Sequence, residues 1–88
     1  MDAKYAYFNA DVPRYAFNVT PSNSVDLEAI TRWITVDGGA TPEIRITLSD
    51  MTDGTFVTVN VTAGVQYRMA VKRLWSTGTT ATGIVGWV

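Results

Sequence analysis

The stretch Glu43-Ile44-Arg45-Ile46-Thr47-Leu48 alternates polar and apolar residues at every position. Successive side chains of a β-strand point to opposite faces, so the pattern predicts a strand with Ile44, Ile46 and Leu48 facing inward. After a turn at residues 49–54, residues 56–61 alternate again, with Val57, Val59 and Val61 on the buried side. These two stretches are expected to form an antiparallel hairpin.

Three further stretches show the same short period, and turns that contain glycine separate them. They are residues 30–36, 66–72 and 83–88, and a short helical turn is expected only at residues 25–29. The chain is therefore predicted to be all-β, a small antiparallel β-sandwich or barrel with an extended N-terminal arm. The residues expected to supply its core are Ile34, Val36, Ile44, Ile46, Val57, Val59, Tyr67, Met69, Val71 and Ile84.

The first part of the chain differs from the rest, because Pro13 and Pro21 interrupt any long element there. We expect residues 1–19 to form the arm and residues 20–88 the β-domain, although residues 14–20 are also compatible with a strand. Tyr5, Tyr7 and Phe8 make the arm rich in aromatic residues. A domain of this size has little interior to bury them, so they are predicted to pack against another subunit.

Composition excludes several classes of function. The 88 residues contain no cysteine and no histidine, so disulfides, thiolate metal sites and histidine-based catalysis are all excluded. The formal net charge is −1, and the pair Lys72-Arg73 is the longest basic run, which argues against a nucleic-acid partner. Both residues are expected to be exposed at a strand end. No apolar run approaches the length of a membrane span, so no membrane contact is predicted.

The acidic residues do not form an evident site. Asp50, Asp53 and Gly54 could supply oxygen ligands to calcium, but Asp and Gly are also the residues that a hairpin turn favours, and this second interpretation is preferred. The remaining carboxylates show no spacing that singles out a catalytic pair. The sequence thus predicts no enzyme, with no catalytic residue, no metal site and no cofactor.

Three tryptophans stand out as candidate contact residues: Trp33, Trp75 and Trp87. A flat indole ring buries a large apolar area and can stack on a sugar or pack against a protein. Packing in the core or against a subunit is the favoured interpretation, because aromatic residues are enriched at protein interfaces.

Several stretches, above all residues 71–85 (Val-Lys-Arg-Leu-Trp-Ser-Thr-Gly-Thr-Thr-Ala-Thr-Gly-Ile-Val), resemble small structural proteins of tailed bacteriophages, prophages and gene transfer agents, including the head spike base family. The likeness covers residues 20 to 88. It implies a non-enzymatic component of the virion, located on the particle surface at the head. The partners it implies are the major capsid protein or a spike protein, together with further copies of the chain in a homo-oligomer.

Two functions from different classes follow from these observations. The first is a repeated capsid subunit, such as a head decoration, cement or spike base protein, that binds its partners through Tyr5, Tyr7, Phe8, Trp33, Trp75 and Trp87. The alternative is a carbohydrate-binding β-module of a phage fibre or larger assembly. A module of this kind would be monomeric and would depend on a surface tryptophan.

Overall fold

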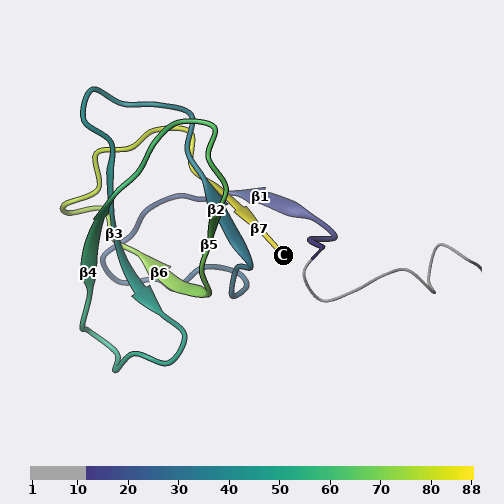
Figure 1. Ribbon diagram of the computed structural model, residues 1–88. Coiled ribbons are helices and arrows are strands. Elements are labelled where there is room, and N and C mark those ends of the chain that lie inside the picture. The colour runs from purple at the N-terminus through teal and green to yellow at the C-terminus, as the bar shows by residue number, and fades with distance from the viewer. Residues whose placement is uncertain (1–11) are drawn as a thin grey trace, which may run out of the picture.

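The computed structural model describes residues 12–88, which form seven β-strands in two sheets (Figure 1). Within these residues there is no helix, and the stretch at 25–29 is irregular backbone that ends in a bend. The all-β prediction is thus confirmed, whereas the helical turn is wrong. The strands are β1 (Ala16–Asn18), β2 (Trp33–Thr35), β3 (Glu43–Leu48), β4 (Val57–Asn60), β5 (Tyr67–Arg68), β6 (Val71–Leu74) and β7 (Val85–Trp87).

One sheet has four strands in the order β1-β7-β2-β5, and the other has three in the order β4-β3-β6. All the strand pairs are antiparallel. β3 and β4 form the predicted hairpin, in which Ile44 pairs with Val59 and Ile46 with Val57. A bulge between Thr47 and Leu48 interrupts the alternation where β3 pairs with β6.

Residues 66–72 form two strands in different sheets instead of the single predicted strand. β5 pairs with β2 in the four-stranded sheet, and β6 pairs with β3 in the three-stranded sheet. The chain crosses between the sheets at Met69 and Ala70. The hydroxyl of Thr31 holds this crossing, because it donates to the Met69 carbonyl at 2.8 Å and accepts from the Val71 amide at 3.1 Å.

The core lies between the sheets and agrees with most of the prediction. The buried apolar residues are Val19, Ile34, Val36, Ile44, Ile46, Val61, Val71, Leu74, Ala81 and Ile84. Val59, Tyr67 and Met69 are only partly buried against this cluster. Val57 was predicted to be in the core but is 46% exposed, because it belongs to the edge strand β4, which no element among residues 12–88 covers. Ile30 is 51% exposed because it precedes β2 and does not share its alternation.

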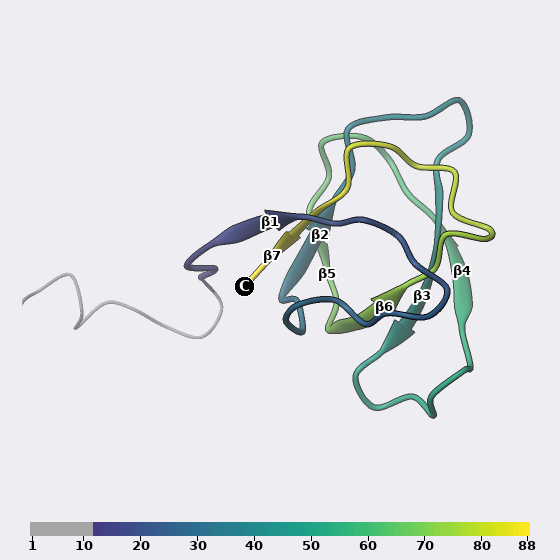
Figure 2. The ribbon, with the colours of Figure 1, turned by 180° about the vertical axis from the view of Figure 1, so that it is seen from behind.

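The two long sides of the sandwich are closed to different extents. On one side, residues 19–30 run beside β6, and the amides of Ser22 and Leu27 each donate at 2.9 Å to carbonyls of Leu74 and Lys72 (Figure 2). We call this the sealed side. On the other side, β4 and β5 are the edge strands of their sheets and no ladder joins them in the described chain. We call this the open side.

Residues 75–81 follow β6 and run along the first half of β3. The amides of Arg45 and Glu43 donate to the hydroxyls of Thr79 and Thr80, each at 3.0 Å. Gly78 has a φ of 91°, and a Cβ there would lie 2.5 Å from the Arg45 side chain. Gly in this threonine-rich motif therefore meets a backbone and a space requirement, and needs no chemical role.

Residues 16–18, which fall within the range expected for the arm, pair with β7 as strand β1. The ladder continues past the strand ends, since Tyr15 and Val88 exchange two backbone hydrogen bonds of 2.9 and 2.8 Å. The division of the chain after residue 19 stays a prediction.

Ile46 tests the assigned core face. Its side chain is 2% exposed, so Ile46→Ala should lower the free energy of unfolding by about 2–5 kcal/mol through lost burial and a cavity. Denaturant unfolding would measure the change, with Val25→Ala on a 64% exposed residue as the control that should alter it little. An unchanged midpoint for Ile46→Ala would contradict the assignment.

Candidate functional site: the outer faces of the two sheets

Trp33 and Trp87 meet on the outer face of the four-stranded sheet. They are direct cross-strand partners of β2 and β7, and the next pair, Ile34 with Gly86, faces inward and is buried. Because side chains alternate along a strand, both indole rings lie on the face that turns away from the core. Each tryptophan is half-buried. The structure thus brings together two of the three tryptophans that the sequence singled out.

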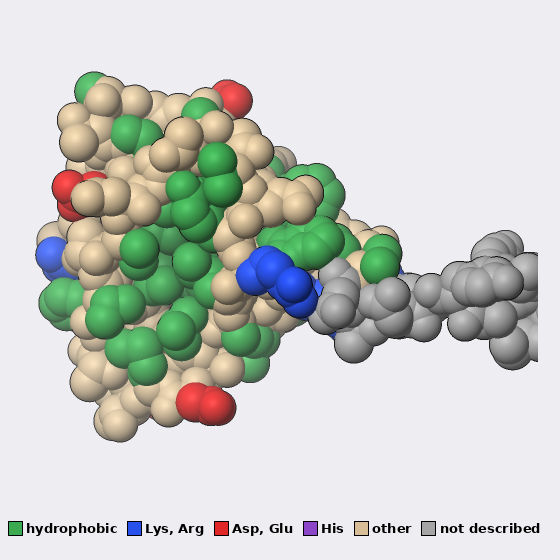
Figure 3. All heavy atoms as spheres, viewed as in Figure 1, with side chains coloured by type: hydrophobic (Ala, Val, Ile, Leu, Met, Phe, Trp, Pro, Cys, Tyr) green, Lys and Arg blue, Asp and Glu red, His purple; other side chains and the backbone are tan. Residues whose placement is uncertain are grey.

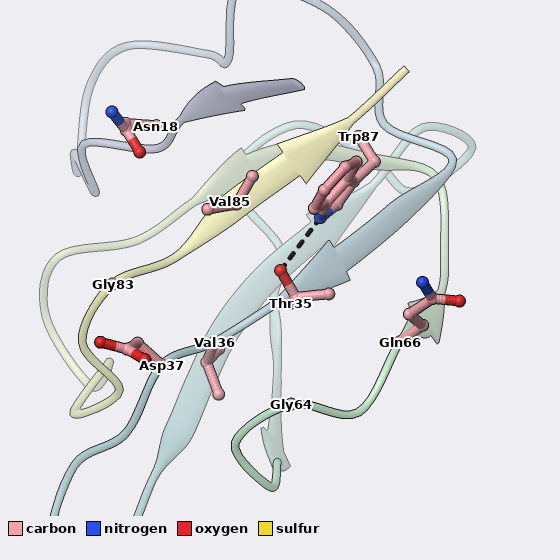
Figure 4. Close-up of a pocket in the computed structure, with 9 residues that line it drawn as sticks. All are labelled: Asn18, Thr35, Val36, Asp37, Gly64, Gln66, Gly83, Val85 and Trp87. Atoms are coloured by element: carbon pink, nitrogen blue, oxygen red, sulfur yellow. Dashed lines mark hydrogen bonds between the residues drawn. The ribbon is translucent and has the colours of Figure 1, made fainter. Parts of the chain in front are cut away.

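A shallow groove of about 540 Å³ runs beside Trp87 of this pair. The Trp87 indole nitrogen donates to the Thr35 hydroxyl at 3.0 Å, which fixes the ring at one end of the groove (Figure 4). The groove's remaining lining is mixed, with apolar Val36 and Val85, small Gly64 and Gly83, and the polar side chains Asn18, Asp37 and Gln66 around its margin. The combination of one flat ring with several amide and carboxylate groups can accept a polar ligand that has an apolar face.

Trp75 lies on the outer face of the three-stranded sheet, away from the other two. Its indole nitrogen donates to the Thr47 hydroxyl at 3.0 Å, and its ring packs on Phe56 with centroids 5.5 Å apart. The guanidinium of Arg73 lies 5.3 Å from the Trp75 ring, and that of Arg45 lies 4.3 Å from the Phe56 ring. Residues of the same chain thus occupy much of this face.

This packing explains the burial of Thr47. The alternation predicted that Thr47 points outward, yet only 2% of it is exposed. Its hydroxyl accepts from Trp75 and donates to the carbonyl of Thr55, so the hydroxyl is satisfied beneath the aromatic pair. Hydrophobic patterning along one strand gives no information on what covers its outer face.

Lys72 and Arg73 are not exposed at a strand end as predicted, because both lie within β6 and their side chains are 20% and 22% exposed. Lys72 Nζ lies 2.5 Å from Asp53 Oδ1, and Arg73 Nε lies 2.8 Å from Asp26 Oδ1. The first pair ties the β3–β4 turn to β6, and the second ties residues 19–30 to β6. The basic pair therefore holds two connecting segments in place.

The ion pair with Lys72 gives Asp53, in the turn at residues 49–54, a structural role. The hydrogen bond and charge of Lys72 hold the pKa of the Asp53 carboxyl below its usual range. Among residues 12–88 there is no group of three His, Cys, Asp or Glu residues that could hold a metal ion, and no helix long and apolar enough to cross a membrane. Elsewhere, a hydrogen bond to Glu28 raises the pKa of the Tyr15 hydroxyl.

Tyr5, Tyr7 and Phe8 lie outside the described residues, so their predicted subunit contacts stay a prediction. Sequence reasoning did not identify Thr35, Asn18 or Gln66 as groove residues. Alternation along residues 30–36 does place Thr35 on the face of Trp33, but which strands lie beside it depends on the order β1-β7-β2-β5, which no local pattern contains.

The described residues thus form a small two-sheet β-sandwich whose larger outer face presents a tryptophan pair. Among solved structures, the chain is similar to a chain of "Capsid of native GTA particle computed with C5 symmetry", a gene transfer agent particle, with 31% sequence identity and a TM-score of 0.78. The match covers 100% of both chains. No family model and no curated protein matches the sequence.

Identity of this level over the full length of both chains shows common descent, and the chain belongs to the family of that gene transfer agent capsid chain. This agrees with the resemblance to phage-like particle proteins found in the sequence.

Asp53 offers a test of the ion pair. A carboxyl whose pKa is depressed in the fold stabilises it above the unfolded pKa and loses that contribution as pH falls through the folded pKa. Asp53→Asn should therefore lower the melting temperature near pH 7, and the gap from the wild type should close as pH falls below the unfolded pKa and through the lowered pKa of Asp53. Asp50→Asn, in the same turn, serves as the control. A gap that is constant with pH would show that the pair contributes nothing.

Proposed function

We propose that this chain is a non-enzymatic structural subunit, repeated on the head of a phage-like capsid as a decoration, cement or spike base protein. The observation that carries the proposal is the full-length likeness, at 31% identity, to a chain of a gene transfer agent capsid. A match that covers both chains completely supports a shared role better than a match of fold alone would.

The surface chemistry supports the same role. The outer tryptophan pair Trp33 and Trp87 and the edge strands of both sheets are features that a free monomer normally avoids, because they promote uncontrolled association. A neighbour in a particle would cover them. We expect the major capsid protein or a spike protein to contact the outer face of the four-stranded sheet, with Trp75 contributing less because it packs within its own chain.

The proposal includes a homo-oligomer. A closed ring covers the exposed strand edge of every copy at once. For this chain we therefore expect a closed cyclic ring.

Purified particles test this proposal directly. Mass spectrometry should detect the chain in particles at many copies per particle, and gold-labelled antibody should mark heads and not tails. Particles from a strain that lacks the chain provide the control for labelling. Absence of the chain from particles would refute the proposal, and label confined to tails would refute the head position.

The groove beside Trp87 favours carbohydrate binding as a second candidate function. A saccharide presents an apolar face to a ring and hydroxyls to groups such as Asn18, Asp37 and Gln66. In that case Trp87→Ala should weaken binding to a cell-surface polysaccharide at least tenfold in calorimetry. Trp75→Phe, which keeps a ring far from the groove, should leave binding unchanged. Absence of wild-type binding to polysaccharides in an array would remove this candidate.

A further inference from the structure

The open side of the sandwich leaves apolar side chains of the inner face exposed to solvent. Val57 pairs with the buried Ile46, and directly paired residues of antiparallel strands share a face, so its side chain points toward the core. It is nevertheless 46% exposed, and Val65 in the connection to β5 is 42% exposed. Figure 3 shows hydrophobic side chains gathered between β4 and β5 on this side. A section of the core is therefore uncovered.

The described chain has no segment left to cover it. Residues 19–30 seal the opposite side, and residues 75–81 lie along β3. β4 and β5 each have a strand neighbour on one edge only. An element that fits here must therefore be extended, supply backbone groups to a strand edge and carry apolar side chains at alternate positions.

We propose that the open side receives residues 4–8 of a neighbouring copy of this chain, which add as a strand beside β4. The segment Lys4-Tyr5-Ala6-Tyr7-Phe8 has the required pattern, since Tyr5 and Tyr7 fall on one face of an extended chain and Phe8 on the other. Tyr5 and Tyr7 pack beside Val57 and Val59. Phe8 then lies on the outer face, where Phe56, which directly precedes β4, is 44% exposed.

The direction of the chain makes the receiver a neighbour. β1 and β5 are at opposite edges of the four-stranded sheet, and residues 12–15 leave β1 away from β4 (Figures 1 and 2). Four residue steps separate Phe8 from Val12, and an extended chain spans about 13 Å over them, so the receiving domain must lie directly beside the β1 edge. An arm that leaves β1 and docks beside β4 of the next copy gives a head-to-tail contact, which closes into a ring where the rotation between copies is a whole fraction of a turn.

This inference rests on the homo-oligomer of the proposed function, and it specifies the contact that joins the copies. Two full-length variants test it. Tyr5→Asp/Tyr7→Asp damages the arm and leaves the open side intact, whereas Val57→Asp places a charge in the open side and leaves the arm intact. Val25→Asp is the matched control, because this 64% exposed valine lies in the segment of the sealed side.

Analytical ultracentrifugation and native mass spectrometry would measure the assembly of each variant alone and of the mixture. We expect the arm variant and the open-side variant each to be monomeric, and Val25→Asp to assemble like the wild type. Mixed together, the two monomers should form a 1:1 dimer and no larger species, because only one intact arm and one intact open side remain per pair. Circular dichroism checks that each variant is folded. If Val57→Asp unfolds, the isosteric Val57→Thr replaces it, and we expect this variant to raise the dissociation constant of the assembly at least tenfold.

Three results would contradict docking of the arm on a neighbouring copy: wild-type assembly by Val57→Asp, a mixture that stays monomeric, or a wild type that is monomeric at all concentrations. A mixture that stays monomeric although the wild type assembles would show that the copies contact each other elsewhere on the molecule. None of these results decides whether the chain is present on particles, which mass spectrometry of the particles measures separately.

Discussion

The hydroxyl of Thr31 holds the point on which the two-sheet arrangement depends. It bridges the Met69 carbonyl and the Val71 amide where the chain leaves β5 and enters β6. Without a partner these two backbone groups would be left unsatisfied beside the core, at a cost of about 1–3 kcal/mol for each buried group. The backbone bonds from Thr31 to Val71 and from Met69 to Arg32 flank this bridge. Together they fix which residues on each side of the crossing face the interior.

The same crossing marks where sequence reasoning succeeds and where it stops. Period-two alternation correctly predicted β3, β4 and their hairpin, because both strands are regular and belong to one sheet. It also predicted that Val71 is buried, yet it treated residues 66–72 as one strand, because alternation continues unchanged through a transfer between sheets. Thr31 is 3% exposed although it is polar, because its hydroxyl bonds both sides of the crossing, a contact that no local pattern indicates.

Other departures have the same origin, which is that local patterns do not reveal neighbours. Val57 has the correct face but lies in an edge strand, and Lys72 lies in a strand but has a carboxylate partner 19 residues earlier. For the candidate site, sequence composition indicated the tryptophans as contact residues. Only the register shows that Trp33 and Trp87 form a pair, while Trp75 packs with Phe56 on the other sheet.

The position of β7 between β1 and β2 has a consequence for the order of folding. β1 and β2 each pair with β7 and not with each other, so the four-stranded sheet cannot be completed until β7, the last strand of the chain, has been made. Pairing over such separations pays a large loop-closure cost before any contact forms, which slows folding. During synthesis the β3–β4 hairpin can form early, whereas the outer tryptophan pair comes into existence only when the sheet is complete. The surface that carries this pair is therefore absent from nascent chains.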